Sequence, residues 1–432
     1  MERSHSRMTP RAVVAATSGN VLEWYDFTVY GFLAPTLGRI FFPSEDHVAS
    51  LLSAFAVLAI GYAARPIGSV IYGYVGDRLG RKPALLSSVM LMGIGSVLIG
   101  VLPTHAQIGI AASVLLVLIR IVQGISVAGE YTASGVLVVE EARRESRGLV
   151  GSWIACAMML GCVLGSGVPA LMSSYLTDDQ MIAWGWRIPF FIGGAVALFS
   201  AVLRLHLSES SALAESGERI RSPIRTAIRE YWPTILQMIA LLIPTAIIYF
   251  MIFVYAASYL TGQMHFSTAR ALDISTVNLI VIAVLGVAIG YLSDRFGRRA
   301  MLLIGAIGTL VFAWPLWLLM HQTSLAGVFL GQLGFAAFNA IGWALSITVL
   351  SEMVPTRLRC SAVALSYNIC MAAFGGTTPI IATYLVNRTG DDFAPVYYVM
   401  IATLVSLPVV MRLPKLVRAA QRPRTSSPDP GP

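Results

Sequence analysis

The sequence GYVGDRLGRK, at residues 73–82, lies between two long apolar stretches and returns in the second half of the chain as GYLSDRFGRR, at residues 290–299. Both copies hold an aspartate, two arginines and three small residues at the same offsets. A second repeated feature is a glutamate with an arginine seven residues further on, seen in Glu140 with Arg147 and in Glu352 with Arg359. Duplicated halves of this kind are a common plan of membrane carriers. The repeat therefore predicts a chain of two related halves.

The composition indicates a protein that crosses a membrane several times. Of the 432 residues, 56% are hydrophobic and 12% are charged, and the mean hydropathy is +0.73. Soluble proteins carry about 25% charged residues, so half of the usual charge is absent. The net charge of +8 would also suit nucleic acid. Basic loops on the cytoplasmic side of a membrane protein explain it better, and we expect no nucleic-acid partner.

A membrane-spanning helix needs about 20 largely apolar residues. Twelve stretches meet this requirement: 12–40, 48–76, 83–102, 107–139, 148–176, 186–206, 234–260, 270–293, 299–320, 324–350, 358–386 and 393–413. The sequence thus predicts an all-α membrane protein with twelve transmembrane helices in two pseudo-symmetric six-helix bundles. The expected domains are an N-terminal bundle at 1–206, a cytoplasmic linker at 207–233, a C-terminal bundle at 234–418 and a disordered cytoplasmic tail at 419–432. A short amphipathic helix is expected in the linker near Arg225 to Tyr231.

The distribution of basic residues predicts the orientation. If the N-terminus is inside, most of the 30 Lys and Arg residues fall in cytosolic segments, and Arg204 is counted among these in the segment 204–233, at the end of the predicted span 186–206. Arg65 and Arg120 remain inside the membrane. We therefore expect both termini to be cytoplasmic, in the plasma (inner) membrane.

Some chemistries have no support in the sequence. No nucleotide-binding loop of the form G-x-x-x-x-G-K-[ST] occurs, so an ATP-driven pump is not indicated. The cysteines lie in or beside predicted helices without metal-ligand spacing, and we interpret them as apolar packing residues: Cys156, Cys162, Cys360 and Cys370. No cofactor and no metal are expected, and no nucleophile–base pair points to an enzyme.

The repeated loop has the chemistry of a gate at one face of the membrane. Its aspartate can reach the N-terminus of a neighbouring helix or a basic side chain, and its glycines allow close contact between helices. Orientation by positive charge is the simpler alternative, but it requires neither the aspartate nor the glycines. We expect these residues to contribute to gating: Asp77, Arg78, Arg81, Glu140, Arg147, Asp294, Arg295, Arg298, Glu352 and Arg359.

The doubled loop, the twelve predicted spans and the central linker resemble the major facilitator superfamily over essentially the whole chain. Four shorter stretches resemble its metabolite:proton symporter branch: GNVLEWYDF at 19–27, RPIG at 65–68, QGISVAGEYT at 123–132 and WGWRIPFF at 184–191. That branch includes carriers of proline and glycine betaine, α-ketoglutarate, citrate and shikimate. The run GEYT at 129–132 looks most like the proline/betaine carriers.

Charged residues are expected inside the membrane at Glu23, Asp26, Arg65, Arg120 and Glu130. Each costs about 2.5–3.5 kcal/mol at the centre of a helix, which implies pairing, a water-filled cavity or a titrating role. Glu23, Asp26 and Tyr30 share one face of the first helix. Two acids this close favour holding a proton, so Asp26 and Glu23 are candidates for proton coupling. The alternative is a structural acid paired with Arg65 or Arg120.

A narrow polar stripe follows the fourth predicted helix through Arg120, Gln123, Glu130 and Ser134. A guanidinium can grip a carboxylate with two parallel hydrogen bonds. Arg120 is therefore expected to bind a substrate carboxylate or to be the static partner of an acid, and the same alternatives hold for Arg65. Glu130 lies nearer the cytosol and suits a further proton carrier or a contact of the inner gate.

The second half has no charge at comparable depth. It offers polar and aromatic side chains, which are candidates for substrate contacts or for packing between helices: Tyr249, Tyr255, Asn278, Asn339, Trp343, Tyr367 and Asn368. Among them we expect Tyr249, Asn339, Trp343 and Asn368 to bind substrate, together with Tyr30 and Gln123 of the first half.

The primary expectation is a proton-coupled symporter that imports a small carboxylate-bearing metabolite, an organic acid or a zwitterion such as proline or betaine, by alternating access. The alternative is a proton-driven efflux antiporter of a small organic compound. A third hypothesis is a membrane receptor, but the sequence contains no sizeable stretch typical of a soluble signalling domain. The expected partners are the solute, protons and the lipid bilayer, and the expected state is a monomer.

Overall fold

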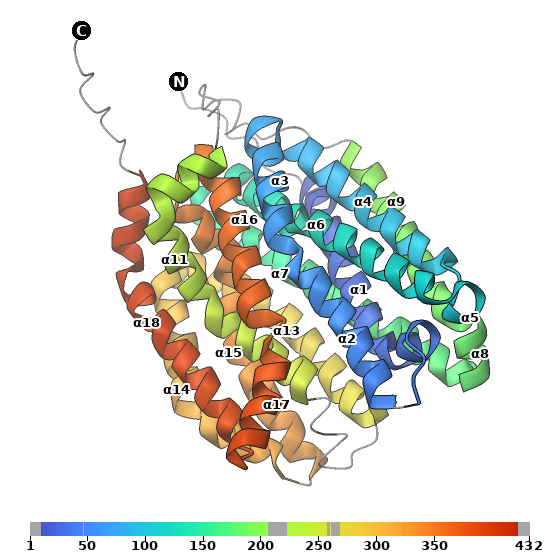
Figure 1. The fold of residues 1–432 in the computed structure, drawn as a ribbon. Coiled ribbons are helices and arrows are strands. Elements are labelled where there is room, and N and C mark those ends of the chain that lie inside the picture. Colours follow the sequence, from blue (N-terminus) through green and yellow to red (C-terminus); the bar gives the residue numbers. More distant parts are fainter. Residues whose placement is uncertain are drawn as a thin grey trace.

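The protein is described by a computed structural model over residues 10–45, 47–205, 223–256, 260, 268–322 and 324–421. Within these ranges every regular element is helical, and the long helices run side by side across the molecule (Figure 1). Eleven helical segments of the described chain are long and apolar enough to cross a membrane. The remaining long helix, α1 (Pro10–Phe41), has 32 residues and carries Glu23 and Asp26 in its middle. The predicted all-α membrane architecture is confirmed.

The first half contains six long segments and two short surface helices. In chain order its helices are α1, α2 (His47–Ala63), α3 (Arg65–Arg78), α4 (Arg81–Val101), α5 (His105–Ile108), α6 (Ile110–Glu141), α7 (Arg147–Tyr175), α8 (Asp178–Ala183) and α9 (Ile188–Leu205). The predicted span 48–76 is interrupted at Ala64, and Pro66 occupies the first turn of the helix that follows. Proline is tolerated in a first helical turn because its missing N–H would have no helical partner there.

The second half is α11 (Pro223–Phe250), α13 (Thr268–Phe296), α14 (Arg298–Met320), α15 (Leu325–Glu352), α16 (Arg359–Cys370), α17 (Thr378–Thr389) and α18 (Ala394–Gln421). Short π-helical segments follow α11, at Met251–Tyr255, and α16, at Met371–Gly375. The amphipathic helix expected near Arg225 to Tyr231 is the first part of α11, so the helix begins inside the predicted linker. Residues 207–222 of that linker and 422–432 of the predicted tail lie outside the described residues.

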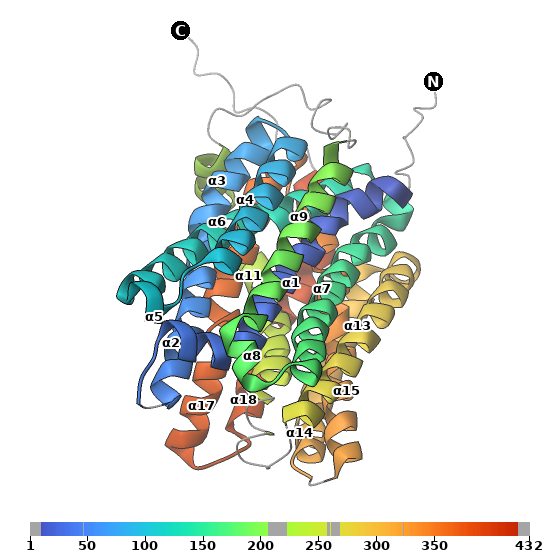
Figure 2. The same cartoon turned by 90° about the vertical axis from the view of Figure 1, so that its right-hand side faces the viewer.

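The two halves meet along two pairs of helices. Helix α7 packs along α13, and α3 packs along α16. The first described residues of α1 and the last of α18 lie at the same end of the bundle (Figures 1 and 2). The first copy of the repeated loop joins α3 to α4, and the second joins α13 to α14. Both copies lie at this end of the bundle.

Small residues let the helices of the first half approach closely. A Cβ atom at Gly68 would overlap the backbone oxygen of Ile125, and one at Gly124 would overlap the backbone of Gly61. These contacts press α2 and α3 against α6, in the way that small residues bring transmembrane helices together. The arrangement brings charged residues of distant helices into the same layer of the bundle.

Candidate functional site

Asp26 lies in the middle of α1 and is completely buried. Its Oδ1 accepts a hydrogen bond from Ser96 Oγ of α4 at 2.5 Å, and its Oδ2 accepts one from Gln123 Nε2 of α6 at 2.6 Å. Arg120 Nη1 lies 3.7 Å from Oδ2 and donates to Gln123 Oε1 at 3.0 Å. Asp26, predicted to carry a proton, thus forms one network with Arg120 and Gln123, both predicted to bind substrate.

A second ion pair lies nearby on the same helix. Glu23 Oε1 is 3.3 Å from Arg65 Nη1, and both residues are buried, with 1% of their surface exposed. The other carboxylate oxygen of Glu23 has no hydrogen-bond partner among the described residues. Glu23 and Asp26 each pair with an arginine of their own, as expected if these acids have a structural role.

The two arginines share one aromatic ring. The guanidinium carbons of Arg65 and Arg120 lie 4.6 Å and 4.4 Å from the centroid of Phe27. Arg65 also faces Tyr62 at 4.3 Å, and Arg120 faces Tyr30 at 4.5 Å. Tyr30 is therefore a neighbour of Arg120, and its hydroxyl donates to the carbonyl of Ala54 at 3.2 Å. Rings of this kind stabilise a buried cation through their electron-rich faces. Arg120 still has Nε and Nη2 without a hydrogen-bond partner in the described chain.

Three aromatic side chains meet where the halves join. Trp24 of α1, Tyr249 of α11 and Trp343 of α15 contact one another edge to face, with ring centroids 5.5 to 5.7 Å apart. The Tyr249 hydroxyl also lies 3.2 Å from Cys162 Sγ. The indole N–H groups of both tryptophans find no acceptor among the described residues. We call Trp24, Tyr249 and Trp343 the aromatic triangle.

Further contacts cross the junction on the side of the repeated loops. The Tyr131 hydroxyl lies 2.7 Å from Ser346 Oγ, and the Tyr131 and Tyr367 rings stack with centroids 4.0 Å apart. Asn368 Nδ2 donates to the carbonyl of Ala128 at 3.3 Å. Asn368 is thus a contact between the halves. The central charged residues are nearly fully buried, with at most 1% of the surface of Glu23, Asp26, Arg65 and Arg120 exposed.

Asn339 lies elsewhere. It lines a small cavity of about 40 Å³ inside the second half, between α11, α14, α15 and α18, beside Thr245 and Thr309. Neither amide atom has a hydrogen-bond partner in the described chain. A larger groove of about 600 Å³ lies between the ends of α1, α2 and α6, lined by apolar residues such as Phe41 and Val117 together with Ser53, Ser113 and His105.

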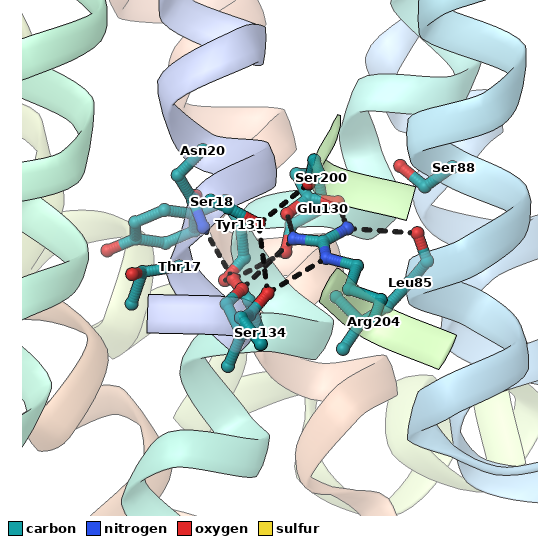
Figure 3. A network of polar contacts seen from close by, with 12 residues as sticks. Thr17, Ser18, Asn20, Leu85, Ser88, Glu130, Tyr131, Ser134, Ser200 and Arg204 are labelled. Carbon is teal, nitrogen blue, oxygen red and sulfur yellow. Dashed lines mark hydrogen bonds and ion pairs between the residues drawn. The ribbon is translucent and has the colours of Figure 1, made fainter. Parts of the chain in front are cut away.

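Glu130 is paired with Arg204, which the sequence analysis counted among the cytosolic basic residues. Arg204 of α9 is completely buried and donates to both carboxylate oxygens of Glu130 (Figure 3). The same guanidinium donates to the carbonyls of Ala15, Ala16 and Leu85. The predicted span 186–206 contains Arg204, but the count of basic residues treated it as part of a cytosolic segment; it lies in the last turn of α9 and faces the bundle interior.

The repeated aspartates make equivalent contacts across the two halves. Asp77 accepts from the backbone N–H and hydroxyl of Ser361, at 2.9 and 2.5 Å, in the first turn of α16. Asp294 accepts from the backbone N–H groups of Gly148 and Leu149, both at 2.8 Å, in the first turn of α7. A carboxylate is stabilised there by the free N–H groups and the positive end of the helix dipole.

Arginines and glutamates complete these contacts. Arg81 pairs with Asp77 at 2.7 Å and with Glu140 at 3.3 Å, and Glu140 reaches Arg359 of the other half at 3.1 Å. In the second copy, Arg298 pairs with Asp294 at 2.6 Å and lies 3.7 Å from Glu352.

The remaining predicted gate residues are placed differently. Arg147 begins α7, and its backbone carbonyl accepts from Thr348 at 3.1 Å. Arg78 contacts Tyr74 on the surface, and Arg295 is exposed.

Sequence reasoning missed Ser96, Ser361 and Arg204. The serines carry no signal because serine is common in transmembrane helices. Arg204 did carry a signal in the sequence. It lies at the end of an apolar stretch, two helical turns after Ala197, so the two residues share one face of the helix. The structure shows that this face is buried.

Comparison with known proteins agrees with this geometry. Residues 11–219 match the family described as "Sugar (and other) transporter", and residues 272–431 match "Major Facilitator Superfamily". A proline/betaine transporter of Salmonella typhimurium is 34% identical over 409 residues, which cover 92% of this chain and 82% of the relative. A glycine betaine/proline/ectoine/pipecolic acid transporter of Dickeya dadantii is also 34% identical, with 92% and 81% covered.

Solved structures show the same fold. A proton:xylose symporter of the major facilitator superfamily, bound to 6-bromo-6-deoxy-D-glucose, has a TM-score of 0.76 at 19% identity, covering 94% of this chain and 95% of that chain. A partially occluded inward-open xylose transporter from E. coli has a TM-score of 0.72. The chain therefore belongs to the major facilitator superfamily, and it is a membrane transporter rather than an enzyme.

Proposed function

We propose that this transporter imports a small carboxylate-bearing solute together with protons by alternating access. The observation that carries the proposal is the Asp26–Arg120 pair, a completely buried ion pair in which Arg120 Nε and Nη2 have no hydrogen-bond partner among the described residues. A buried arginine with unused donors is suited to receive a carboxylate from a solute.

The same pair supplies a coupling mechanism. When a solute carboxylate binds Arg120, Asp26 loses part of its counter-ion, and a carboxyl group without a counter-ion in hydrocarbon is favoured in its protonated form. When the solute leaves, Arg120 returns to Asp26 and the proton is released. Each ligand thus favours the binding of the other, as linkage requires. Glu23, with Arg65, provides a second acid–base pair of this kind on the same helix.

The charges favour a zwitterion over a polyanion. Glu23 and Asp26 balance Arg65 and Arg120, so these central residues are neutral together, and a di- or tricarboxylate would bring unbalanced negative charge into a buried site. The aromatic triangle can contact an ammonium group through its rings, and Glu23, which precedes Trp24 in the chain, has one carboxylate oxygen without a hydrogen-bond partner among the described residues. Proline/betaine transporters at 34% identity support this choice.

We place the carrier in the plasma (inner) membrane as a monomer, with both termini in the cytoplasm. Support comes from the basic loops at the end where both described chain ends lie, and from bacterial relatives. In this orientation the closed contacts of Asp77 and Asp294 seal the cytoplasmic side.

Uptake by proteoliposomes tests the proposal. Purified carrier is reconstituted, and labelled proline and glycine betaine are supplied outside, with citrate and α-ketoglutarate as the anionic arm. We expect an inwardly directed proton gradient to drive accumulation of a zwitterion, and a protonophore to abolish it. Accumulation that survives the protonophore would refute coupling, and accumulation only in inverted vesicles would establish efflux instead.

A further inference from the structure

We propose that Arg204 and Glu130 form a permanently ionised strut that positions α1 against α6, and that through this strut Arg204 acts as a positioning residue for the Asp26–Arg120 pair. This inference rests on the proposed proton coupling. It assigns a role to Arg204 and removes Glu130 from the residues that carry protons.

The guanidinium of Arg204 has all five of its N–H donors engaged. Nε donates to the carbonyl of Ala15 at 3.2 Å, Nη1 to the carbonyl of Leu85 at 3.0 Å, and Nη2 to the carbonyl of Ala16 at 3.0 Å. The two remaining donors reach Glu130, through Oε2 at 2.7 Å and through Oε1. Five is the full capacity of the side chain.

This saturation argues against a proton on Glu130. Both carboxylate oxygens accept from the same guanidinium, in the parallel geometry of a strong charge-assisted pair. Protonation would replace an acceptor by a donor that faces Arg204 and would leave a completely buried guanidinium without its counter-ion. Removing one partner of a buried ion pair costs several kcal/mol. The Asp26–Arg120 pair differs because Nε and Nη2 of Arg120 have no hydrogen-bond partner among the described residues.

The strut joins four helices of one half. Arg204 belongs to α9, its carbonyl partners to α1 and α4, and Glu130 to α6. Figure 3 shows these contacts together with two neighbouring ones: Ser18 to Ser200 at 2.7 Å, and Asn20 Nδ2 to Ser134 Oγ at 2.7 Å. All of them lie within the first half, so none has to break when the two halves move relative to each other.

Gly19 permits this close approach. A Cβ atom at Gly19 would overlap the carboxyl group of Glu130 and the guanidinium of Arg204. Asp26 lies on the same face of α1 as Gly19, two helical turns further along the chain. Its partner Arg120 lies on α6, as does Glu130. Helices α1 and α6 are thus held together at two levels. A shift of α1 at the strut is transmitted to the distance between Asp26 and Arg120, because a helix moves as a stiff rod over two turns.

The test uses a glycine pair that leaves every charge in place. Gly19→Ala forces α1 away from the strut, and Gly31→Ala on the same helix is the matched control, because a Cβ there meets nothing within 4 Å. For each variant two rates are measured with labelled proline or glycine betaine: gradient-driven accumulation, and counterflow, which exchanges solute without net proton movement. Dividing accumulation by counterflow removes differences in the amount of folded carrier.

We expect Gly19→Ala to lower this ratio at least threefold while Gly31→Ala keeps it. Arg204→Lys, which retains the charge but has fewer donors, is the milder second variant and is expected to lower the ratio about twofold. An unchanged ratio in both Gly19→Ala and Arg204→Lys, with counterflow and accumulation falling in parallel, would mean that the strut only stabilises the fold and would overturn the positioning role.

The double variant Glu130→Gln/Arg204→Gln tests the absence of a proton on Glu130. It leaves no unpaired charge, and we expect measurable gradient-driven accumulation, above that of Glu130→Gln alone. Because loss of positioning alone is expected to lower accumulation only severalfold, accumulation at background in both Glu130→Gln and the double variant, with counterflow preserved in both, would make Glu130 a proton carrier and refute the strut. Failure of the proposed function is distinguishable, because the unaltered carrier would then show no gradient-driven accumulation at all.

Discussion

The carboxylate of Asp77 accepts hydrogen bonds from both the backbone N–H and the hydroxyl of Ser361, at 2.9 and 2.5 Å, across the boundary between the two halves. Asp294 makes the corresponding contact with the first turn of α7. Each half thus caps a helix of the other. The closed end of the carrier is held by two related contacts, and both must part for that end to open.

Replacing Asp77 by Asn is expected to weaken this closure. The change removes the charge that pairs with Arg81 and that attracts the N-terminus of α16, and hydrogen bonds to charged groups contribute about 1.5–3 kcal/mol. We expect the open population to rise roughly tenfold or more. The readout is the alkylation rate of Cys360, which is buried and lies against Gly76 in the closed contact. Asp179→Asn, an exposed acid of α8, is the control. An unaltered Cys360 rate would contradict the gating role of Asp77.

Replacing Asp26 by Asn should separate coupling from transport. The amide keeps the size of the side chain and can remain bonded to Ser96 and Gln123, but it cannot exchange a proton. We expect accumulation driven by a proton gradient to fall to background while counterflow of labelled glycine betaine remains above a tenth of the original rate. Asp178→Asn serves as the exposed control. Gradient-driven accumulation by the Asp26→Asn carrier would exclude Asp26 as the coupling group.

Trp343 of the aromatic triangle is expected to set affinity for a quaternary ammonium. Removing its ring face by Trp343→Leu deletes a cation–π contact of about 1–2 kcal/mol, equivalent to roughly a 5- to 30-fold rise in the KM for glycine betaine. Trp314→Leu is the matched control because Trp314 is 45% exposed on the outer surface of α14. Equal KM values for the two variants would remove the triangle from the binding site.

Gly124 is expected to be essential for stability. A methyl group there would overlap the backbone of Gly61 and push α6 away from α2, and overpacking of this kind costs about 1–3 kcal/mol. We expect Gly124→Ala to lower the melting temperature measured by fluorescence-detected size exclusion. Gly167→Ala, where a Cβ meets nothing within 4 Å, should leave it unchanged or slightly raised, since alanine is the better helix former. A melting temperature for Gly124→Ala equal to that of Gly167→Ala would contradict the close approach.

Features that depend on neighbours in the chain were predicted well. The repeat at 73–82 and 290–299, the lengths of the apolar stretches and the shared face of Glu23 and Asp26 follow from local periodicity. They define two halves of membrane helices with charges at mid-depth. The beginning of α11 at Pro223 was predicted only in part, because a polar helical extension has the same local composition as a linker.

The partners of those charges required the tertiary structure. Sequence alone left Arg65 and Arg120 with several possible acids, and it gave Arg204 no partner. It also grouped Asn339 with the central site, although Asn339 faces a cavity within the second half. Periodicity states which residues share a face of one helix, but the residue opposite that face depends on how helices far apart in the chain cross. Here those crossings are set by small residues such as Gly19 and Gly124, whose neighbours are known only once the bundle is assembled.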